Sequence, residues 1–322
     1  MKYLIFGGSG FIGTHLVNYL FENKNVEIYN LDIIENTHDG KSKYCFCDVR
    51  NEIILAFNVS NEDVILNFAA VHRTPGHPDY EYFETNIRGA ENICAFAEKY
   101  GVKKILFTSS IAPYGAAEGL KVEDTLPTPN TPYGISKLVA EKVHEIWQAQ
   151  GSDHELTIVR PGVVFGKGEN GNFTRLYWGI KSGKFFYPGR RDTVKACIYV
   201  KELVRFMMYE LNKSNHVGVE LYNCTFEPAF TIEQIVETMK KVTGIDRKII
   251  TVNGSLLMFV AKIIGSIGGK SLGIHPARVK KLMISTNICG KNLNNNSGYR
   301  FSYSLDEAIA DWYNDNNNDF LK

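Results

Sequence analysis

The stretch that decides the fold lies near the N-terminus, where residues 3–13 read YLIFGGSGFIG. Its apolar run, Tyr3–Phe6, predicts a buried strand, and Phe11–Phe21 predicts the helix that follows. Between them, Gly7, Gly10 and Gly13 recur at three-residue spacing. Glycines so placed permit a tight turn, let the backbone approach a pyrophosphate and let the helix pack on the sheet. The helix N-terminus, with its free N–H groups, favours an anion. The stretch therefore predicts a dinucleotide-binding turn.

Two acidic residues extend this interpretation. Asp32 closes the next predicted strand, Glu27–Leu31, where a carboxylate accepts hydrogen bonds from adenosine ribose hydroxyls and repels a 2′-phosphate. No arginine stands beside Asp32 in the sequence, which favours NAD over NADP. Asp48 follows a short strand, Tyr44–Phe46, and is placed either to reach the adenine amino group or to serve as an ordinary loop carboxylate.

The rest of the first half alternates short apolar runs with longer amphipathic ones. This alternation predicts an α/β fold, a Rossmann-type doubly wound parallel sheet covered by helices on both faces. Beyond residue 165 the pattern loosens, which predicts a smaller, mixed α/β C-terminal lobe. We expect one domain over residues 1–165 and the second lobe over 166–322, with the chain free to cross back between them. The further strands expected are Val64–Phe68, Lys104–Thr108 and Leu156–Val159, and the further helices are Asn86–Lys99, Pro132–Gln150, Lys201–Leu211, Thr231–Val242 and Ser304–Tyr313.

Composition narrows the function classes. In 322 residues, 36 Lys and Arg face 35 Asp and Glu, so no basic excess supports binding to nucleic acid or to a membrane surface. The six cysteines form no C-x-x-C pair and no zinc-ligand spacing, so we expect reduced thiols, no metal and a cytoplasmic location. We expect no secretory signal, because the first residues resemble a strand that enters a glycine turn. The apolar run Leu256–Ile267 is interrupted by Lys262 and Gly265 and is too short to span a bilayer, so we expect no membrane insertion.

A tyrosine and a lysine share one face of the helix expected over Pro132–Gln150. Thr131 suits the N-cap, and Tyr133 and Lys137 lie four residues apart. A free tyrosine has a pKa of about 10, and a nearby ammonium group lowers that pKa. The pair is therefore suited to exchange a proton with a carbinol hydroxyl while hydride moves to NAD. Ser110, just after the strand Lys104–Thr108, is placed to donate to a substrate oxygen, whereas Ser109 fits either that role or a turn.

Taken together, these residues resemble the extended short-chain dehydrogenase/reductase family, and within it the NAD-dependent nucleotide-sugar epimerases and dehydratases. The resemblance covers most of the chain and weakens beyond about residue 225. It implies a nucleotide-sugar substrate and a homodimer formed through the helices expected at 86–99 and 132–150. The motifs that carry it are Gly7-x-x-Gly10-x-x-Gly13, Asp32, Asn67-Phe68-Ala69-Ala70, Ser110-x-x-x-Tyr114-Gly115, Tyr133-x-x-x-Lys137 and Arg160-Pro161-Gly162.

The resemblance also implies roles for individual residues. The glycine turn would hold the pyrophosphate and Asp32 the ribose, with Asp48 and Val49 beside the adenine. Ser110, Tyr133 and Lys137 would be catalytic, and Tyr133 and Lys137 would also contact the cofactor. The remaining cofactor-side residues are Phe11, Ile12, Ala69, Ala70, Asn86, Ser109 and Pro161. On the substrate side stand Asn172, Lys195 and Arg278, together with His72 and Arg73, which fit an ordinary loop equally well.

One departure from the family selects among its reactions. The dehydratases carry an Asp-Glu pair directly after the catalytic Ser or Thr, and the decarboxylases a nearby Glu, but this chain has Ile111 and Ala112 there. We therefore predict a 4-epimerase that passes through a transient 4-keto sugar. Alternatives are an NAD(P)-dependent reductase of a 4-keto nucleotide sugar, a hydroxysteroid dehydrogenase, and a non-catalytic NAD-binding protein on the same fold.

Overall fold

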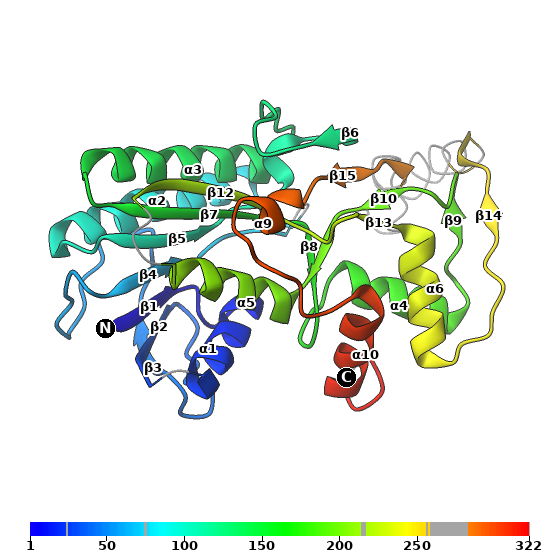
Figure 1. Cartoon of the computed structure of the whole chain (residues 1–322), viewed down its shortest axis with the longest axis horizontal. Coiled ribbons are helices and arrows are strands. Elements are labelled where there is room, and N and C mark those ends of the chain that lie inside the picture. The colour runs from blue at the N-terminus through cyan, green and yellow to red at the C-terminus, as the bar shows by residue number, and fades with distance from the viewer. Residues whose placement is uncertain (24, 74–75, 214–216, 256, 258–282, 322) are drawn as a thin grey trace.

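A computed structural model of the chain describes residues 1–23, 25–73, 76–213, 217–255, 257 and 283–321. Two lobes lie side by side, with the N-terminus in the first and the C-terminus in the second (Figure 1). Arg278 and most of the run Leu256–Ile267 lie outside the described residues.

The first lobe is built on one seven-stranded sheet. Its order is β12-β7-β5-β4-β1-β2-β3, and every neighbouring pair is parallel. The order reverses direction between β1 and β4, and ligands of such sheets bind in the crevice outside the carboxyl ends of the strands at this point. The predicted doubly wound parallel sheet is confirmed. Its strands are β1 (Lys2–Phe6), β2 (Glu27–Asp32), β3 (Lys43–Phe46), β4 (Val64–Asn67), β5 (Lys104–Thr108), β7 (Glu155–Pro161) and β12 (Gly218–Cys224).

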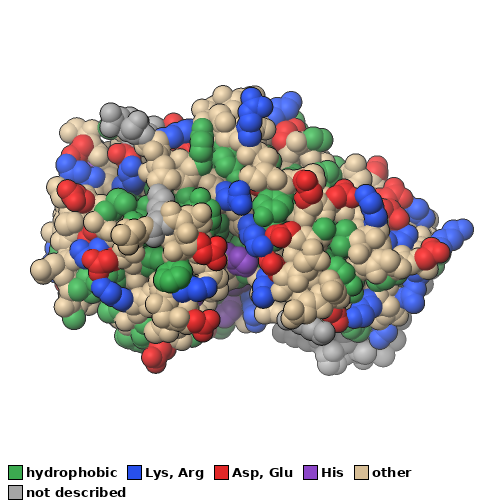
Figure 2. Space-filling model, turned by 60° about the horizontal axis from the view of Figure 1, so that its bottom comes forward, with side chains coloured by type: hydrophobic (Ala, Val, Ile, Leu, Met, Phe, Trp, Pro, Cys, Tyr) green, Lys and Arg blue, Asp and Glu red, His purple; other side chains and the backbone are tan. Residues whose placement is uncertain are grey.

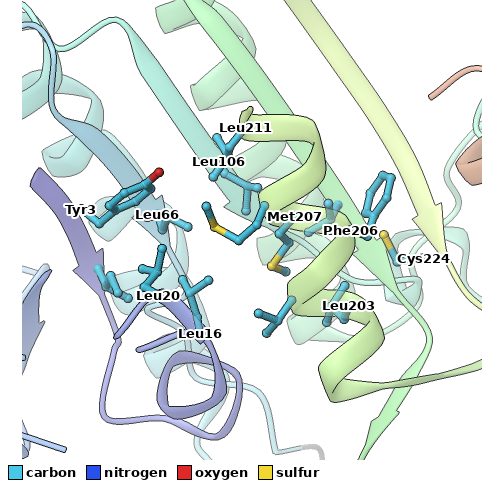
Figure 3. Close-up of a cluster of buried hydrophobic side chains, with 14 of the residues drawn as sticks. Tyr3, Leu16, Leu20, Leu66, Leu106, Leu203, Phe206, Met207, Leu211 and Cys224 are labelled. Atoms are coloured by element: carbon cyan, nitrogen blue, oxygen red, sulfur yellow. The ribbon is translucent and has the colours of Figure 1, made fainter. Parts of the chain in front are cut away.

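Helices cover both faces of this sheet (Figure 1). Helices α1 (Phe11–Asn23) and α5 (Val200–Leu211) pack on one face, and α2 (Asp79–Tyr100) and α3 (Pro132–Gln150) on the other. Figure 3 shows the core beneath α1 and α5, where Leu16, Leu66 and Leu203 are fully buried. Helix α2 begins seven residues before the predicted start, because Pro78 and the acidic residues of the first turn favour a helix N-terminus there.

The second lobe has small sheets and an aromatic core. Phe165 and Phe173 stack with ring centroids 4.5 Å apart, and Trp312 packs against both. A four-stranded sheet runs β13 (Phe230–Thr231), β10 (Val194–Lys195), β15 (Thr286–Ile288), β6 (Ala117–Lys121). Two strand pairs complete the lobe, β8 (Val163–Phe165) with β11 (Cys197–Tyr199) and β9 (Tyr187–Pro188) with β14 (Thr251–Val252). Among the described residues, α4 (Asn172–Ser182), α6 (Ile232–Thr243) and α10 (Leu305–Asp315) belong to this lobe. The short helices η1 (Ala112–Tyr114) and α9 (Lys291–Asn295) contact α3 and β12 of the first lobe.

The chain passes repeatedly between the lobes. β6 leaves the first lobe to join the four-stranded sheet of the second, and α3 and β7 then return. After residue 165 the chain crosses back again, because α5 packs against α1 and β12 forms one edge of the seven-stranded sheet. Within the described residues, no helix combines the length and the apolar character needed to cross a membrane.

Candidate active site

The glycine turn joins β1 to α1 at the switch point of the sheet. Gly7 has φ +79°, and a Cβ there would lie 2.6 Å from the backbone N of Ala69. A Cβ on Gly13 would lie 2.6 Å from the Cα and carbonyl oxygen of Gly8, so the first turn of α1 packs directly on the turn backbone. A Cβ on Gly10 would lie 3.2 Å from the carbonyl oxygen of Gly7. The steric need for glycine is thus greatest at Gly7 and Gly13.

Asp32 ties this turn to the end of β2. Its Oδ2 accepts a hydrogen bond from the backbone N–H of Ser9 at 3.0 Å, and its Oδ1 accepts one from Ile34 N–H at 2.9 Å. The half-buried carboxylate therefore faces the turn from the strand edge, as the sequence predicts.

Two further residues brace the turn, and sequence reasoning missed both. The buried Asn30 donates to Ser9 Oγ at 2.9 Å, and the ring of the buried His38 hydrogen-bonds the carbonyl oxygen of Gly8 at 3.0 Å. Neither belongs to a recognisable motif. The signals available were a polar residue inside an apolar strand and a histidine in the following loop.

The two residues assigned to the adenine lie at the end of β3. Asp48 is paired with Arg50, whose Nη2 lies 2.6 Å from Asp48 Oδ2, and this ion pair lowers the pKa of Asp48. Val49 is buried, and α2 approaches it so closely that a Cβ on Gly89 would lie 2.8 Å from Val49 Cγ2. The carboxylate is thus engaged locally, and Val49 packs beneath α2.

The opposite wall of the crevice follows β4. Ala69 and Ala70 are half-buried, and Ala69 lies against Gly7. The buried Asn86 of α2 accepts from the backbone N–H of Val71 at 2.8 Å and donates to Ser136 Oγ of α3 at 2.8 Å. Asn86 therefore joins the crevice wall to the start of α3.

The proposed catalytic residues come together where β5 ends and α3 begins. Helix α3 starts as the sequence predicts, with the Thr131 side chain accepting from Gly134 N–H at 3.1 Å. The Ser110 side chain lies close enough to the Tyr133 hydroxyl to lower the pKa of that hydroxyl. Ser110 Oγ also accepts from the backbone N–H of Ala112 at 3.1 Å. The serine and tyrosine hydroxyls thus face a common point at the carboxyl edge of the sheet.

The sequence led us to expect that Lys137 lowers the pKa of Tyr133. In the structure, the pKa of Tyr133 is raised above its ordinary value of 10. Burial raises the pKa of Tyr133, and the nearby Ser110 side chain opposes this only in part. Lys137 is 2% exposed and its ammonium lies 4.4 Å from the ring centroid of Phe107. Burial lowers the pKa of Lys137 to about 7, against the opposing effect of Glu141. Burial is therefore the main cause of both shifts, and it favours the neutral form of each group.

Two more predicted cofactor residues lie behind this pair. Ser109 is buried, and its hydroxyl donates to Glu141 of α3 rather than serving the local turn. Pro161 is the buried last residue of β7, and its carbonyl accepts from the backbone N–H of Ile111 at 3.2 Å. Pro161 therefore fixes the loop that carries Ser110.

The predicted substrate-side residues are spread over both lobes. His72 and Arg73 are exposed just beyond β4, with the Arg73 carbonyl accepting from the hydroxyl of Tyr82. Asn172 is exposed at the start of α4, and the Lys195 ammonium donates to the carbonyl of Ile284 at 2.8 Å. Figure 2 shows His side chains near the centre of this face, with Lys and Arg side chains and Asp and Glu side chains interspersed around them.

The residues present fit NAD. Positions 7 and 13 accept only glycine, because a Cβ at either one would collide with neighbouring backbone atoms. At these positions no side chain can obstruct a pyrophosphate bound at the N-terminus of α1. Asp32 stands at the distance from the turn that suits a ribose, and no Lys or Arg of the described chain hydrogen-bonds its carboxylate. The described residues contain no group of three or more His, Cys, Asp or Glu arranged to bind a metal ion.

Comparisons with known proteins agree with this geometry. A model of the NAD dependent epimerase/dehydratase family matches residues 3–225. The chain is 32% identical over 312 residues to N-acetyl-alpha-D-glucosaminyl-diphospho-ditrans,octacis-undecaprenol 4-epimerase of Escherichia coli O157:H7, covering 95% of this chain and 92% of that protein. It is 29% identical over 277 residues to UDP-glucose 4-epimerase of Lactobacillus helveticus, covering 76% of this chain and 83% of that protein.

Solved structures show the same fold. MoeE5 in complex with UDP-glucuronic acid and NAD is similar with a TM-score of 0.74 and 21% identity, over 98% of this chain and all of that one. UDP-N-acetylglucosamine 4-epimerase from Bacillus cereus is similar with a TM-score of 0.73 and 18% identity, over 97% of this chain and 98% of that one.

Proposed function

The chain belongs to the NAD-dependent epimerase/dehydratase family, and on that basis we propose that it is a 4-epimerase of a sugar carried on a diphosphate, with a nucleotide as the leading carrier. One observation carries the proposal: the Ser110 side chain lies beside the Tyr133 hydroxyl, with Lys137 one turn further along the same helix. These are the groups needed to move a proton at a carbinol carbon beside a nicotinamide. Ile111 and Ala112 next to them supply no acid or base for eliminating water.

The geometry suggests how the chain's residues divide the work. Bound in its oxidised form, NAD supplies a hydride acceptor for C4 and a positive charge that favours the Tyr133 phenolate. Tyr133 removes the proton of the C4 hydroxyl, and Ser110 donates a hydrogen bond to the same oxygen. Lys137 stabilises the phenolate. When C4 has inverted, Tyr133 returns the proton. General acid–base catalysis of this kind contributes about 10²–10⁴ in rate.

A second carrier is favoured by a specific observation. The Escherichia coli relative, whose name gives a polyprenol-linked sugar diphosphate as substrate, is matched over 95% of this chain, whereas the Lactobacillus UDP-glucose 4-epimerase is matched over 76%. The sequence between residues 256 and 281 also combines an apolar run with Lys270, Arg278, Lys280 and Lys281. A polyprenyl diphosphate sugar presents the same sugar and diphosphate, so the same catalytic residues serve either carrier.

We further propose a cytoplasmic homodimer. Ile135, Val139 and Ile146 lie on one side of α3 and are 40%, 38% and 61% exposed. Helix α3 packs along α2, and these three side chains form an apolar strip on the exposed side of α3. Apolar residues grouped in this way favour a second copy of the chain.

The first experiment uses the purified protein as isolated. Denaturation releases any bound nucleotide for identification, and the native protein is incubated with UDP-, GDP- and dTDP-sugars and with a polyprenyl diphosphate N-acetylhexosamine. Bound NAD, a C4 epimer and no net NADH would support the proposal, and the substrate converted identifies the carrier. Consumption of NADH only with a 4-keto sugar would make the protein a reductase instead.

A further inference from the structure

A fully buried carboxylate lies one turn beyond the catalytic lysine. Glu141 follows Lys137 by four residues on α3, so both side chains emerge on the same face of the helix. Glu141 is 0% exposed, and three donors hold it: Arg160 Nε at 2.8 Å, Arg160 Nη2 at 2.6 Å, and the hydroxyl of Ser109. Each of these contacts faces the sheet, and none goes to Lys137.

Arg160 is itself held from its far side. Its Nη1 donates to the hydroxyl of Tyr114 at 2.7 Å, and that hydroxyl donates to Asn223 Oδ1 at 2.8 Å. All these side chains are buried, on β7, η1 and β12. A bidentate arginine–carboxylate pair with both ends fixed has little freedom to rearrange. The position of the Glu141 charge is therefore set by the fold.

Few charged groups face Lys137. On α3 its neighbours are Tyr133, Glu141 and His144. His144 is neutral near pH 7, because burial lowers its pKa to about 4. On β5 the Lys137 ammonium meets the Phe107 ring, and beyond β4 it acts electrostatically on His72. Among the described residues, Glu141 supplies the negative charge that favours the protonated lysine.

We propose that Glu141 is a positioning residue that keeps Lys137 protonated, and that Arg160 and Ser109 hold the carboxylate back from a direct ion pair with the lysine. The ammonium then keeps its hydrogen atoms for the cofactor ribose and for the Tyr133 phenolate. A carboxylate bonded directly to Lys137 would occupy those donors. The inference rests on the proposed function.

The test is the pH dependence of the holoenzyme carrying Glu141→Gln. Loss of the carboxylate lets Lys137 deprotonate at lower pH, so the alkaline limb of kcat/KM should move down by about one pH unit or more. The Kd for NAD, titrated against pH, should begin to rise at correspondingly lower pH. Glu145→Gln is the matched control, because Glu145 lies one turn further on α3 and pairs at the surface with Lys142. Its two profiles should match those of the wild type.

Either an unchanged alkaline limb in Glu141→Gln, or a uniform loss of activity without a shift, would overturn the inference. If the single variant does not fold because Arg160 is left buried and unpaired, the double variant Glu141→Gln/Arg160→Gln replaces it. Its downward shift should be smaller, because loss of the Arg160 charge partly offsets loss of the Glu141 charge, and a double variant without any shift would overturn the inference. The NAD titration separates the two proposals. A shifted NAD profile in a protein without epimerase activity would refute the proposed function alone, whereas an unshifted profile would refute the role of Glu141.

Discussion

At the scale of single residues, the hydroxyl of Tyr133 is the group on which turnover depends. Tyr133→Phe removes the proton acceptor and leaves the glycine turn and Asp32, the main proposed cofactor contacts, unchanged. We expect kcat to fall about 10²–10⁴-fold with NAD still bound. Product chromatography measures turnover, and absorbance after denaturation measures bound NAD. Tyr80→Phe, on an exposed side chain of α2, is the control, and a Tyr133→Phe enzyme within a few-fold of wild type would contradict the mechanism.

Lys137 makes a separate prediction about stability. Its folded-state pKa of about 7 lies below the ordinary value of 10.5, so between these pH values the unfolded chain holds a proton that the folded chain has released. The contribution of Lys137 to the free energy of unfolding therefore rises with pH in this window, by about 1.4 kcal/mol per unit, and is constant below pH 7. Urea unfolding of the NAD-free protein at pH 7.5 and 9, compared with a variant that lacks the lysine, measures this contribution.

The comparison that isolates this contribution is Lys137→Met. Buried tyrosines and cysteines with raised pKa values act in the opposite direction in both proteins, so only the difference between the two is informative. The variant should gain less stability, or lose more, than wild type between the two pH values. Parallel pH dependences would show that Lys137 titrates normally.

The sequence indicated Ser110, Tyr133 and Lys137 correctly in space because helical spacing and strand ends dictate where such residues meet. It did not indicate that Glu141 and Arg160 pair behind them. Glu141 shares the periodicity of Lys137 along α3, but its partner comes from β7, nineteen residues later, and only the packing of α3 on the sheet brings the two together. The direction of the Tyr133 pKa was wrong for the same reason, because burial cannot be read from spacing.

At the scale of elements, the turn between β1 and α1 tolerates no side chain at Gly13. Gly13→Ala places a Cβ 2.6 Å from the Gly8 backbone, and α1 must shift. Overpacking of this kind costs about 1–3 kcal/mol, and the displaced helix N-terminus should bind NAD more weakly. NAD titration and thermal unfolding measure the two effects.

The matched control for this variant is Gly119→Ala. Gly119 lies in β6, where a Cβ would have no described atom within 4 Å and the backbone does not need a positive φ. The substitution should leave NAD affinity and stability close to wild type. Equal behaviour of the two variants would mean that the turn relaxes without disturbing the cofactor site.

Elements with strong local patterns were predictable, and those defined by distant partners were not. The five buried strands and the helix α3 follow from apolar runs and from Thr131-Pro132. β12 escaped prediction because Gly218–Cys224 becomes a sheet strand only by pairing with β7, more than fifty residues earlier. Apart from β6, the strands of the second lobe have two or three residues each and carry too little pattern to detect.

At the scale of the whole molecule, the proposed dimer depends on the outer face of α2 and α3. Val139→Glu places a charge in that apolar surface, where burial against a partner would leave it unpaired. We expect the variant to be monomeric by light scattering coupled to gel filtration, with wild type a dimer. Ile54→Glu, on an apolar side chain that is 74% exposed elsewhere, should remain dimeric. A monomeric wild type would refute the dimer.

The repeated crossing of the chain has a consequence for recombination between relatives. Exchanging everything after residue 165 with the matching half of another family member would import a foreign α5 and a foreign β12 along with the new lobe. The native β7 would then have to pair with the β12 of another protein, whose sequence evolved to pair with that protein's own β7. Chimeras that transfer substrate preference should therefore leave residues 197–224 in place, and a change of substrate in this lineage is easier to reach by point substitution than by exchange of halves.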